Sequence, residues 1–510
     1  MKPRTFKLLA GISAIALLRC VLPAPQAELW RPGSSNSPSG QTPITAATPL
    51  PATYLPPTRE PGQPILSPTP DAQRFLPTLR VNDEQYVLQP GDTLGKIAQK
   101  FQVSLDQLIS ANQIGNPDLV DVGQVLVIPV ATPQAPGSAF KIIPDSELVY
   151  GPASMTLDVF QYVKSTGGYL ANYRETLDDG MYTGAEIILK VAREYSVNPR
   201  ILLAVLDYMS GWVTRAEPAE GTLNYPMLYF DGDRVGLYRQ LAWAANQLNR
   251  GYYLWKVNAL SHFALADNGM APANGTINAG TAGVQQLMAA LFGRSEWDKA
   301  VSDQGIFATY SSMFGYPFDL AIEPMIPADL TSPPMQLPFE PGVVWSFTGG
   351  PHGGWGDGSA WAAIDFAPPP GAYNCSVSDA WATAVTGGTV VRSETGVVVL
   401  DLDGDGLEQT GWTVLYLHIS SSERIPAGSV VAIGDRIGHP SCEGGVSNGT
   451  HLHLARRYNG EWIPADGLQP FNLDGWISRG VGVEYNGTLE LNGATVEAWD
   501  RLVPQNQISR

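Results

Sequence analysis

The chain has 510 residues, which is enough for several domains. Its formal net charge is −17, from 48 Asp and Glu against 31 Lys and Arg. This charge argues against a nucleic-acid-binding protein, because phosphate neutralisation needs clustered positive side chains. It also gives no attraction to anionic membranes or anionic wall polymers, so attachment to such surfaces requires a specific binding module.

The N-terminus has the pattern of a secretory signal. Three basic residues precede an apolar run over 8–18, which is too short to span a bilayer comfortably. We predict a signal peptide over 1–27 and a secreted or envelope-associated protein. Cys20 also admits a lipid anchor, although Arg19 stands where bacterial lipoproteins carry a small residue. The membrane is a partner only if this segment is retained or lipidated.

Cleavage of the signal would leave two cysteines, Cys375 and Cys442. In an exported protein two cysteines allow one intramolecular disulfide. The alternative is two separate buried thiols.

Residues 28–83 form a linker rich in Pro, Ser and Thr, and a second linker covers 132–142. The block between them, 84–131, has the pattern strand, helix, helix, strand. Thr93 and Ser104 are the expected helix caps.

The motifs YVLQPGDTL, IAQKF, LISAN and GQVLVIP of this block resemble the lysin motif (LysM), a small βααβ glycan-binding module. The resemblance implies peptidoglycan glycan strands as a partner and a sugar groove between two loops. Carried over, the groove residues are Gly91, Asp92, Thr93, Leu94, Ile114, Gly115 and Asn116. Turn and cap chemistry is the alternative interpretation of these residues.

Residues 143–335 have a helical pattern. Thr183 and Glu186 have the spacing of a capping box, Asn198 is an N-cap, and Gly211 is a stop signal.

The segment VNPRILLAVLDYMSG weakly resembles the lysozyme-like fold of lytic transglycosylases. These enzymes carry a catalytic Glu before the Ser-Gly, as the acid for glycoside cleavage. Met209 occupies that position here, and Asp207 is expected to face elsewhere on the helix. We therefore expect a non-catalytic helical module, either a glycan cradle or a plain spacer.

From about residue 340 the chain changes to short β-runs with Gly-rich turns, which predicts an antiparallel β-domain over 336–480 followed by a tail over 481–510. Five of the six histidines lie here: His352, His418, His439, His451 and His453. Such a cluster favours a metal site.

His451 and His453 point to the same face of a strand, because side chains alternate along it. Zinc hydrolysis needs three protein ligands, an open position for water and a base for the water's proton. His453 is a good ligand, and His451 is placed to be the base. His418 and Asp365 lie at the ends of other predicted strands.

The order IDFAPPPG, LYLHIS, GDRIG, GTHLHL resembles the lysostaphin-type zinc endopeptidases, which cut peptidoglycan peptides. The resemblance covers 343–468. It implies that Asp365 and His453 bind zinc, that His451 is the catalytic base, and that His418 is its partner in stabilising the oxyanion.

The family's first ligand is a His four residues before the Asp, but Trp361 stands there in this chain. Trp has only an N–H donor and cannot bind a metal. The nearest substitute is His352, and the glycines between it and Asp365 allow the loop to fold back. If His352 is instead an ordinary loop residue, the zinc site is incomplete.

Residues Asp401, Asp403 and Asp405 have the spacing of half a calcium loop, but Trp412 replaces the acid that would complete an EF-hand. A turn between two strands is the preferred interpretation. His439 is expected to be a loop bystander.

The sequence therefore predicts a multidomain α+β protein: a βααβ lysin motif, a lysozyme-like helical domain and an antiparallel β peptidase domain. The predicted function is a secreted, zinc-dependent peptidoglycan endopeptidase that the lysin motif targets to its substrate. The alternative is a catalytically inactive peptidoglycan-binding or amidase-activating factor.

Overall fold

The computed structural model describes residues 68, 70–76, 82–89, 91–101, 103–117, 120–130, 135–369 and 375–510. The predicted signal peptide with Cys20, most of the 28–83 linker and the start of the 132–142 linker lie outside the described residues. Within the described part of the chain, no helix is long and apolar enough to cross a membrane.

The first folded module has the predicted order of elements: β1 (Glu84–Val87), α1 (Leu94–Lys100), α2 (Leu105–Asn112) and β2 (Val125–Ile128). β1 and β2 pair in antiparallel fashion. Thr93 Oγ1 accepts from Lys96 N at 3.2 Å, and Ser104 forms a capping box with Gln107. Both predicted helix caps are therefore confirmed.

The helical domain follows. Its helices are α3 (Val159–Thr166), α4 (Tyr169–Asn172), α5 (Gly184–Tyr195), α6 (Pro199–Ser210), α7 (Leu237–Lys256), α8 (Ala279–Leu291), α9 (Arg294–Ala300) and α10 (Ile306–Phe314). Two small hairpins join them: β3 (Arg174–Leu177) with β4 (Gly180–Thr183), and β5 (His262–Ala264) with β6 (Met270–Pro272). The capping box of Thr183 and Glu186 opens α5, and Asn198 caps α6. α6 ends at Gly211 with φ 70°, as its sequence predicts.

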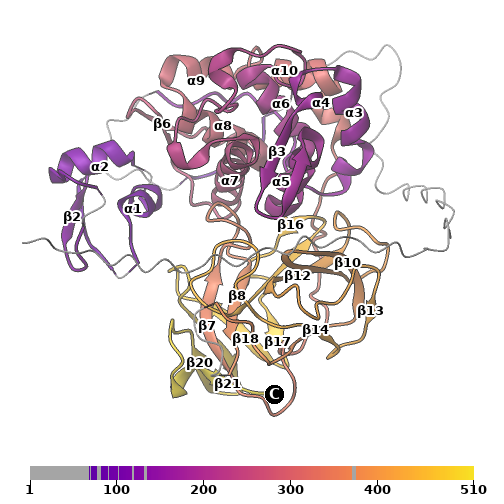
Figure 1. The fold of residues 1–510 in the computed structure, drawn as a ribbon. Helices are drawn as coiled ribbons and strands as arrows, with labels where there is room; N and C mark the ends of the chain where they lie inside the picture. Colours follow the sequence, from indigo (N-terminus) through magenta and orange to yellow (C-terminus); the bar gives the residue numbers. More distant parts are fainter. Residues whose placement is uncertain are drawn as a thin grey trace, which may run out of the picture. The chain divides into compact units, whose positions relative to one another are not determined.

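The C-terminal domain is built on a nine-stranded antiparallel sheet (Figure 1). Its spatial order is β13 (Val430–Val431), β10 (Gly388–Glu394), β11 (Gly396–Asp401), β12 (Trp412–Ile419), β15 (Leu452–Tyr458), β8 (Ala363–Ala367), β7 (Trp345–His352) and β21 (Gln507–Ile508), with β16 (Glu461–Trp462) paired to β15. β9 (Ala382–Thr383) pairs with β14 (Arg436–Gly438).

The two faces of this sheet pack against different partners, because side chains alternate along each strand. One face joins the core of the C-terminal domain itself: Ile364, Phe366, Val398, Leu400, Val414, Tyr416, Leu452 and Leu454. The other face joins the core of the helical domain: Ala363, Val397, Val399, Leu415, Leu417, Ala455 and Trp462. The hydroxyl of Tyr253 on α7 accepts a hydrogen bond from Trp462 N at 2.9 Å across this contact.

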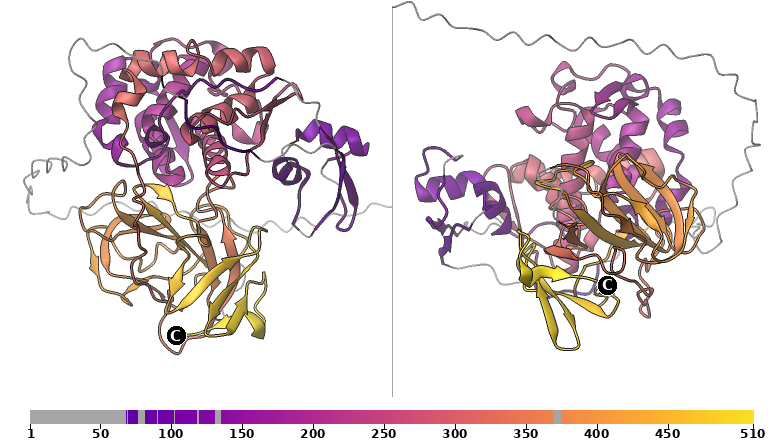
Figure 2. Two further views of the ribbon diagram at one scale, coloured as in Figure 1. Left: turned by 180° about the vertical axis from the view of Figure 1, so that it is seen from behind. Right: turned by 60° about the horizontal axis from the view of Figure 1, so that its bottom comes forward.

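The structure differs from the expected tail at 481–510. These residues form β19 (Gly487–Leu491) and β20 (Ala494–Glu497), which complete a four-stranded sheet with β17 (Asn472–Leu473) and β18 (Trp476–Gly480), and β21 then pairs with β7. The yellow strands of Figure 2 show this C-terminal sheet. Short strands with exposed alternate positions carry little apolar content, which is why the sequence pattern did not reveal them.

Candidate active site

Strand pairing brings the predicted metal ligands together. His453 on β15 stands opposite Asp365 on β8, and His352 on β7 stands opposite Ala363 on β8. His352 is thirteen residues from Asp365 along the chain, but β7 and β8 are neighbouring antiparallel strands. The loop between them therefore folds back and returns the imidazole to the carboxylate.

The three side chains present one ligand atom each to a common point. His352 Nε2 lies 3.0 Å from His453 Nδ1 and 3.2 Å from Asp365 Oδ1. His453 Nδ1 lies 3.3 Å from the same carboxylate oxygen. Three ligands about 2.0–2.1 Å from a tetrahedral ion stand roughly 3.3 Å apart, so these residues fit a metal of zinc's size.

The backbone around the site is irregular in a way that aims these side chains. The pairing of β7 with β8 shifts register on both sides of Gly349. Such bulges re-aim a side chain at the end of a strand. Gly349 itself leaves room for the carboxylate, because a Cβ there would lie 2.7 Å from Asp365 Oδ2.

Both imidazoles are oriented from behind by backbone carbonyls. His352 Nδ1 donates to Gly350 O at 2.8 Å, and His453 Nε2 donates to Gly354 O at 3.1 Å. Each hydrogen bond fixes the tautomer and leaves the other ring nitrogen unprotonated for a metal, as in known metal sites. Tyr485 stacks on His352 with the ring centroids 4.2 Å apart.

Burial and the neighbouring imidazoles have opposite effects on the pKa of Asp365. Burial would raise the pKa of Asp365, but the imidazoles of His352 and His451 hold it well below its ordinary value. Burial lowers the pKa of His453. Asp365 Oδ1 is buried and receives no hydrogen bond of regular geometry, so it has an acceptor position to offer a cation.

The two remaining predicted catalytic residues lie beside this group. The ring centroids of His418 and His451 are 4.5 Å apart, and His418 is 6.3 Å from the His453 ring. His418 is the extra residue of a bulge between β11 and β12 and has a φ of 67°. This uncommon backbone conformation for a non-Gly residue is typical of functional positions.

His418 is held in one tautomer. Its Nδ1 donates to Glu443 O at 3.1 Å, which leaves Nε2 with a lone pair. Burial, together with the nearby His451 and His453, lowers the pKa of His418 to about 3. His418 is therefore neutral at neutral pH, and its Nε2 is only weakly basic.

Cys375 and Cys442 are joined by a disulfide with a Cα–Cα distance of 5.2 Å. Ser376 O, next to Cys375, accepts from the Thr450 hydroxyl at 2.6 Å. The bridge and this hydrogen bond tie the segment after Asp365 to the segment that carries His451.

Other predicted sites have structural roles. In the first module Asp92 accepts from Tyr86 Oη and Gln89 N at 2.7 and 2.8 Å, and Leu94 is a core residue. Gly91, with a φ of 87°, makes the turn, and Thr93 caps α1. Ile114 packs against the same core, whereas Gly115 and Asn116 are exposed.

The acidic loop 401–411 joins β11 to β12, as the turn interpretation predicts. Asp401, Asp403 and Asp405 converge, and Asp401 accepts backbone N–H groups of its own loop.

His439 contacts Trp381 and lies outside the metal group. Met209 is buried in α6, and Asp207 accepts from Val213 N and Thr214 N at 3.2 and 2.9 Å.

Sequence reasoning missed Tyr485 and the carbonyls that orient the imidazoles. Tyr485 lies 133 residues from the ring on which it stacks, in a segment expected to be a tail. No local sequence pattern predicts a contact between such distant residues. The run of turn residues before it was the available signal that the chain folds back at this point.

Comparisons with known proteins agree with two of the three modules. Residues 86–129 match the family described as LysM domain, and residues 141–327 match the family described as LasA, N-terminal domain. The LysM resemblance is thus confirmed. The likeness of the helical domain to lytic transglycosylases stays an expectation.

Two kinds of relative match the chain: one over about half of its length and one over a length of a single LysM domain. Protease LasA of Pseudomonas aeruginosa (strain UCBPP-PA14) is 27% identical over 312 residues, which cover 55% of this chain and 68% of the relative. The secreted LysM effector ECP6 of Passalora fulva is 54% identical over 46 residues, covering 9% of this chain and 20% of the relative.

Solved structures with local likeness include two peptidases. The M23 metalloprotease pseudoalterin matches with a TM-score of 0.28 and 23% identity, over 36% of this chain and all of that one. The catalytic domain of lysostaphin from Staphylococcus simulans matches with a TM-score of 0.17 and 20% identity, over 25% of this chain and 89% of that one.

Proposed function

We propose that this chain, which has a LysM domain and a LasA N-terminal domain and is homologous to protease LasA, is a secreted zinc endopeptidase that cuts the peptides of peptidoglycan. The observation that carries the proposal is the triangle of ligand atoms from His352, Asp365 and His453, with sides of 3.0, 3.2 and 3.3 Å. Three converging protein ligands are the usual complement of a catalytic zinc site.

When bound at this triangle, zinc would supply Lewis acidity for a peptide carbonyl and would acidify a water molecule. The protein residues have separate tasks around it. Asp365 and the two imidazoles would hold the ion, and the carbonyls of Gly350 and Gly354 keep the free imidazole nitrogens directed to that point. His451 accepts the proton of the attacking water at Nε2, because its Nδ1 is occupied by Gly449 O.

The family resemblance gives His418 the role of stabilising the oxyanion. In the resting protein its lowered pKa makes it a weak, neutral base with a lone pair at Nε2. A donor role for His418 then follows only after it has gained a proton. Such a proton would be placed beside the developing negative charge and passed on to the leaving amine.

The LysM domain supports peptidoglycan as the substrate, because a chain with a net charge of −17 has no general attraction to an anionic wall. A tethered glycan-binding module raises the effective concentration of the peptidase at its substrate. Of the predicted groove residues, Gly91, Thr93, Gly115 and Asn116 are exposed.

The test is digestion of purified peptidoglycan by the full-length protein, with and without a chelator, followed by identification of the products by mass. We expect chelator-sensitive cleavage of peptide bonds. His352→Ala should lose both the bound metal and the activity, whereas His439→Ala, at a neighbouring histidine outside the metal group, should keep both. If the wild type binds the wall but neither holds metal nor cuts, the inactive wall-binding alternative is correct.

A further inference from the structure

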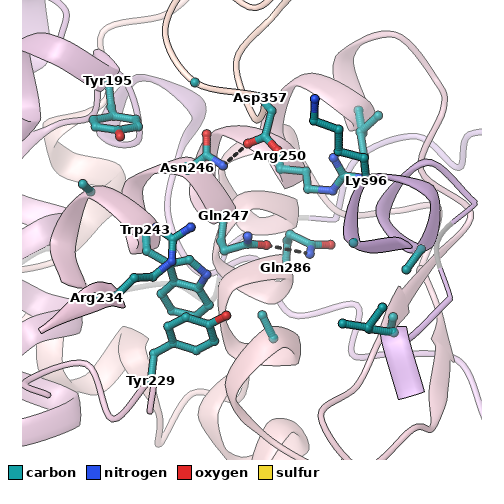
Figure 3. A pocket seen from close by; sticks show the side chains of 18 of the residues that line it. Lys96, Tyr195, Tyr229, Arg234, Trp243, Asn246, Gln247, Arg250, Gln286 and Asp357 are labelled. Carbon is teal, nitrogen blue, oxygen red and sulfur yellow. Dashed lines mark hydrogen bonds between the residues drawn. The ribbon is translucent and has the colours of Figure 1, made fainter. Parts of the chain in front are cut away.

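A second candidate site lies on the helical domain, and none of its residues belongs to the metal group. It is a cavity of about 530 Å³ against the side of α7 (Figure 3). Ligand pockets typically have volumes of roughly 300–1,000 Å³. We call it the α7 pocket and define it by the residues Tyr229, Trp243, Asn246, Gln247, Arg250 and Gln286.

An aromatic pair forms one wall of the α7 pocket. Tyr229 and Trp243 stack with their centroids 3.9 Å apart and their planes 7° from parallel. Trp243 is buried and supports the half-buried Tyr229 ring from behind. The face of an aromatic ring carries partial negative charge and attracts the C–H groups on one face of a sugar ring.

Amide side chains line another part of the pocket. Gln286 donates from Nε2 to Gln247 Oε1 at 3.2 Å, which uses one donor and one acceptor site of the pair. The other amide positions of the pair can serve a ligand. Because an amide both donates and accepts, it suits hydroxyl and acetamido groups, which do the same.

The charge of the pocket is positive, in contrast to the chain as a whole. Arg234, Arg250 and Lys96 line it with the carboxylate of Asp357, and Glu484, outside the lining, also acts electrostatically on Arg250. Burial lowers the pKa of Arg250 to about 10, so this guanidinium stays charged at neutral pH. A partly desolvated guanidinium binds a carboxylate more strongly than an exposed one does.

The pocket shares a loop with the metal group. Gly356 and Asp357 line the pocket, and the same loop presents Gly354 O to His453 Nε2 at 3.1 Å. Asn246 of α7 fixes this loop, because its side chain donates to Asp357 and accepts from Gly358 N at 2.9 Å. A ligand held on α7 therefore adjoins the loop that supports a proposed metal ligand.

We propose that the α7 pocket binds an anionic, N-acetylated oligosaccharide, with its sugar rings against Tyr229, its acetamido and hydroxyl groups on Gln247 and Gln286, and its carboxylate on Arg250. A glycan strand that carries muramic acid has this chemistry. The inference extends the proposed function by giving the substrate polymer a binding site on the helical domain. It concerns binding alone and does not require that the metal group be active.

The test measures binding by calorimetry to the full-length protein in chelator, so that no cleavage occurs. The probes are a soluble tetrasaccharide that contains muramic acid and an uncharged tetramer of N-acetylglucosamine, which reports the binding that does not depend on the carboxylate. We expect Arg250→Gln to weaken binding of the anionic probe by about tenfold or more and to leave the uncharged probe unchanged. The preference of the wild type for the anionic probe should also decrease with salt.

Arg239→Gln is the matched control, because Arg239 is an exposed residue of the same helix that donates to Asp233 O and does not line the pocket. It should bind both probes as the wild type does. If Arg250→Gln does not fold, Gln247→Ala at a half-buried position carries the test, with the same expected weakening. Unchanged binding of the anionic probe in the folded variant, or an equal loss in Arg239→Gln, would overturn the inference.

The two proposals can fail separately. Loss of the binding difference with chelator-sensitive peptide cleavage intact removes only the α7 pocket proposal. Specific binding of the anionic probe by a chain that cuts no peptide bond removes only the peptidase proposal.

Discussion

His451 Nε2 lies 3.8 Å from Asp365 Oδ2, while His451 Nδ1 donates to Gly449 O at 2.8 Å. Nε2 of His451 therefore faces Asp365 Oδ2. The other carboxylate oxygen, Oδ1, belongs to the ligand triangle. A base in this position borders the metal group without belonging to it. This position agrees with the proposed role of His451 as a base and of His453 as a ligand, although the two lie on one face of the strand.

We predict that His451→Ala keeps the metal and lowers turnover by about 10²–10⁴-fold, because a positioned acid–base group contributes this much. Metal content by elemental analysis and the turnover number on a peptide substrate are the two measurements. Loss of metal in this variant would mean that His451 is a ligand.

His418→Ala should also keep the metal and reduce turnover in the same range. The structure gives His418 an unprotonated Nε2, so its removal should change the pH profile of turnover as well as its maximum. A variant with normal turnover and an unchanged profile would exclude His418 from the chemistry. His439→Ala, which removes a histidine outside the metal group, is the control for both variants.

The disulfide should stabilise the fold. Replacing Cys375 and Cys442 by Ser is expected to lower the free energy of unfolding by about 2–4 kcal/mol, because the bridge restricts the unfolded chain. Denaturant unfolding measures this, and the reduced wild type should match the double variant. Two thiols that react with a labelling reagent in the oxidised protein would show that the bridge does not form.

Glu408 is a buried carboxylate between two buried guanidiniums. It accepts from Arg392 at 2.6 and 2.9 Å and from Arg457 at 2.7 Å. Burial alone would raise the pKa of Glu408, but the two Arg side chains lower it from 4.5 to about 2. Its contribution to stability is complete above about pH 4.5 and is lost as the pH falls toward 2, because the unfolded chain takes up the proton first.

We therefore expect Glu408→Gln to cost about 3–5 kcal/mol at neutral pH, since it leaves Arg457 without its counter-charge and Arg392 with only the longer ion pair to Glu394 at 3.7 Å. The variant should also lack the part of the acid-induced loss of stability that occurs between about pH 4.5 and pH 2. Denaturant unfolding at several pH values measures both effects. Glu490→Gln, at an exposed ion pair with Arg479, is the control and should change stability little.

The helical domain should have no glycosidase activity, because buried Met209 holds the place of the catalytic acid and Asp207 is engaged with backbone N–H groups. Full-length His352→Ala, incubated with glycan strands, provides the test without interference from the peptidase. Anhydro-muramyl products in the mass spectrum would contradict the prediction.

Local signals predicted much of this fold. The helix caps at Thr93, Ser104, Thr183 and Asn198 occur as expected, because capping depends on residues three positions apart or fewer. The grouping of Asp365 with His453 followed from strand periodicity combined with a family resemblance. The part played by His352 was harder to predict, since it depends on two register shifts in β7 that no local pattern encodes.

Long-range contacts escaped prediction altogether. The stacking of Tyr485 on His352 joins segments with no common sequence signal. The packing of Trp462 into the helical domain is of the same kind, because the sequence shows that a Trp is apolar but not which domain buries it.

The helical and C-terminal domains are separate segments of the sequence, but the shared face of the large sheet couples their unfolding. Cutting the chain near residue 335 would expose Val397, Val399, Leu415, Leu417 and Trp462 to water, a contiguous apolar surface of the kind that causes aggregation. We therefore expect that the helical domain and the C-terminal domain do not unfold independently. Residues 141–510 should therefore melt in one cooperative transition, and Trp462→Ala, a change in the β-domain, should lower the melting temperature of the helices along with that of the sheet.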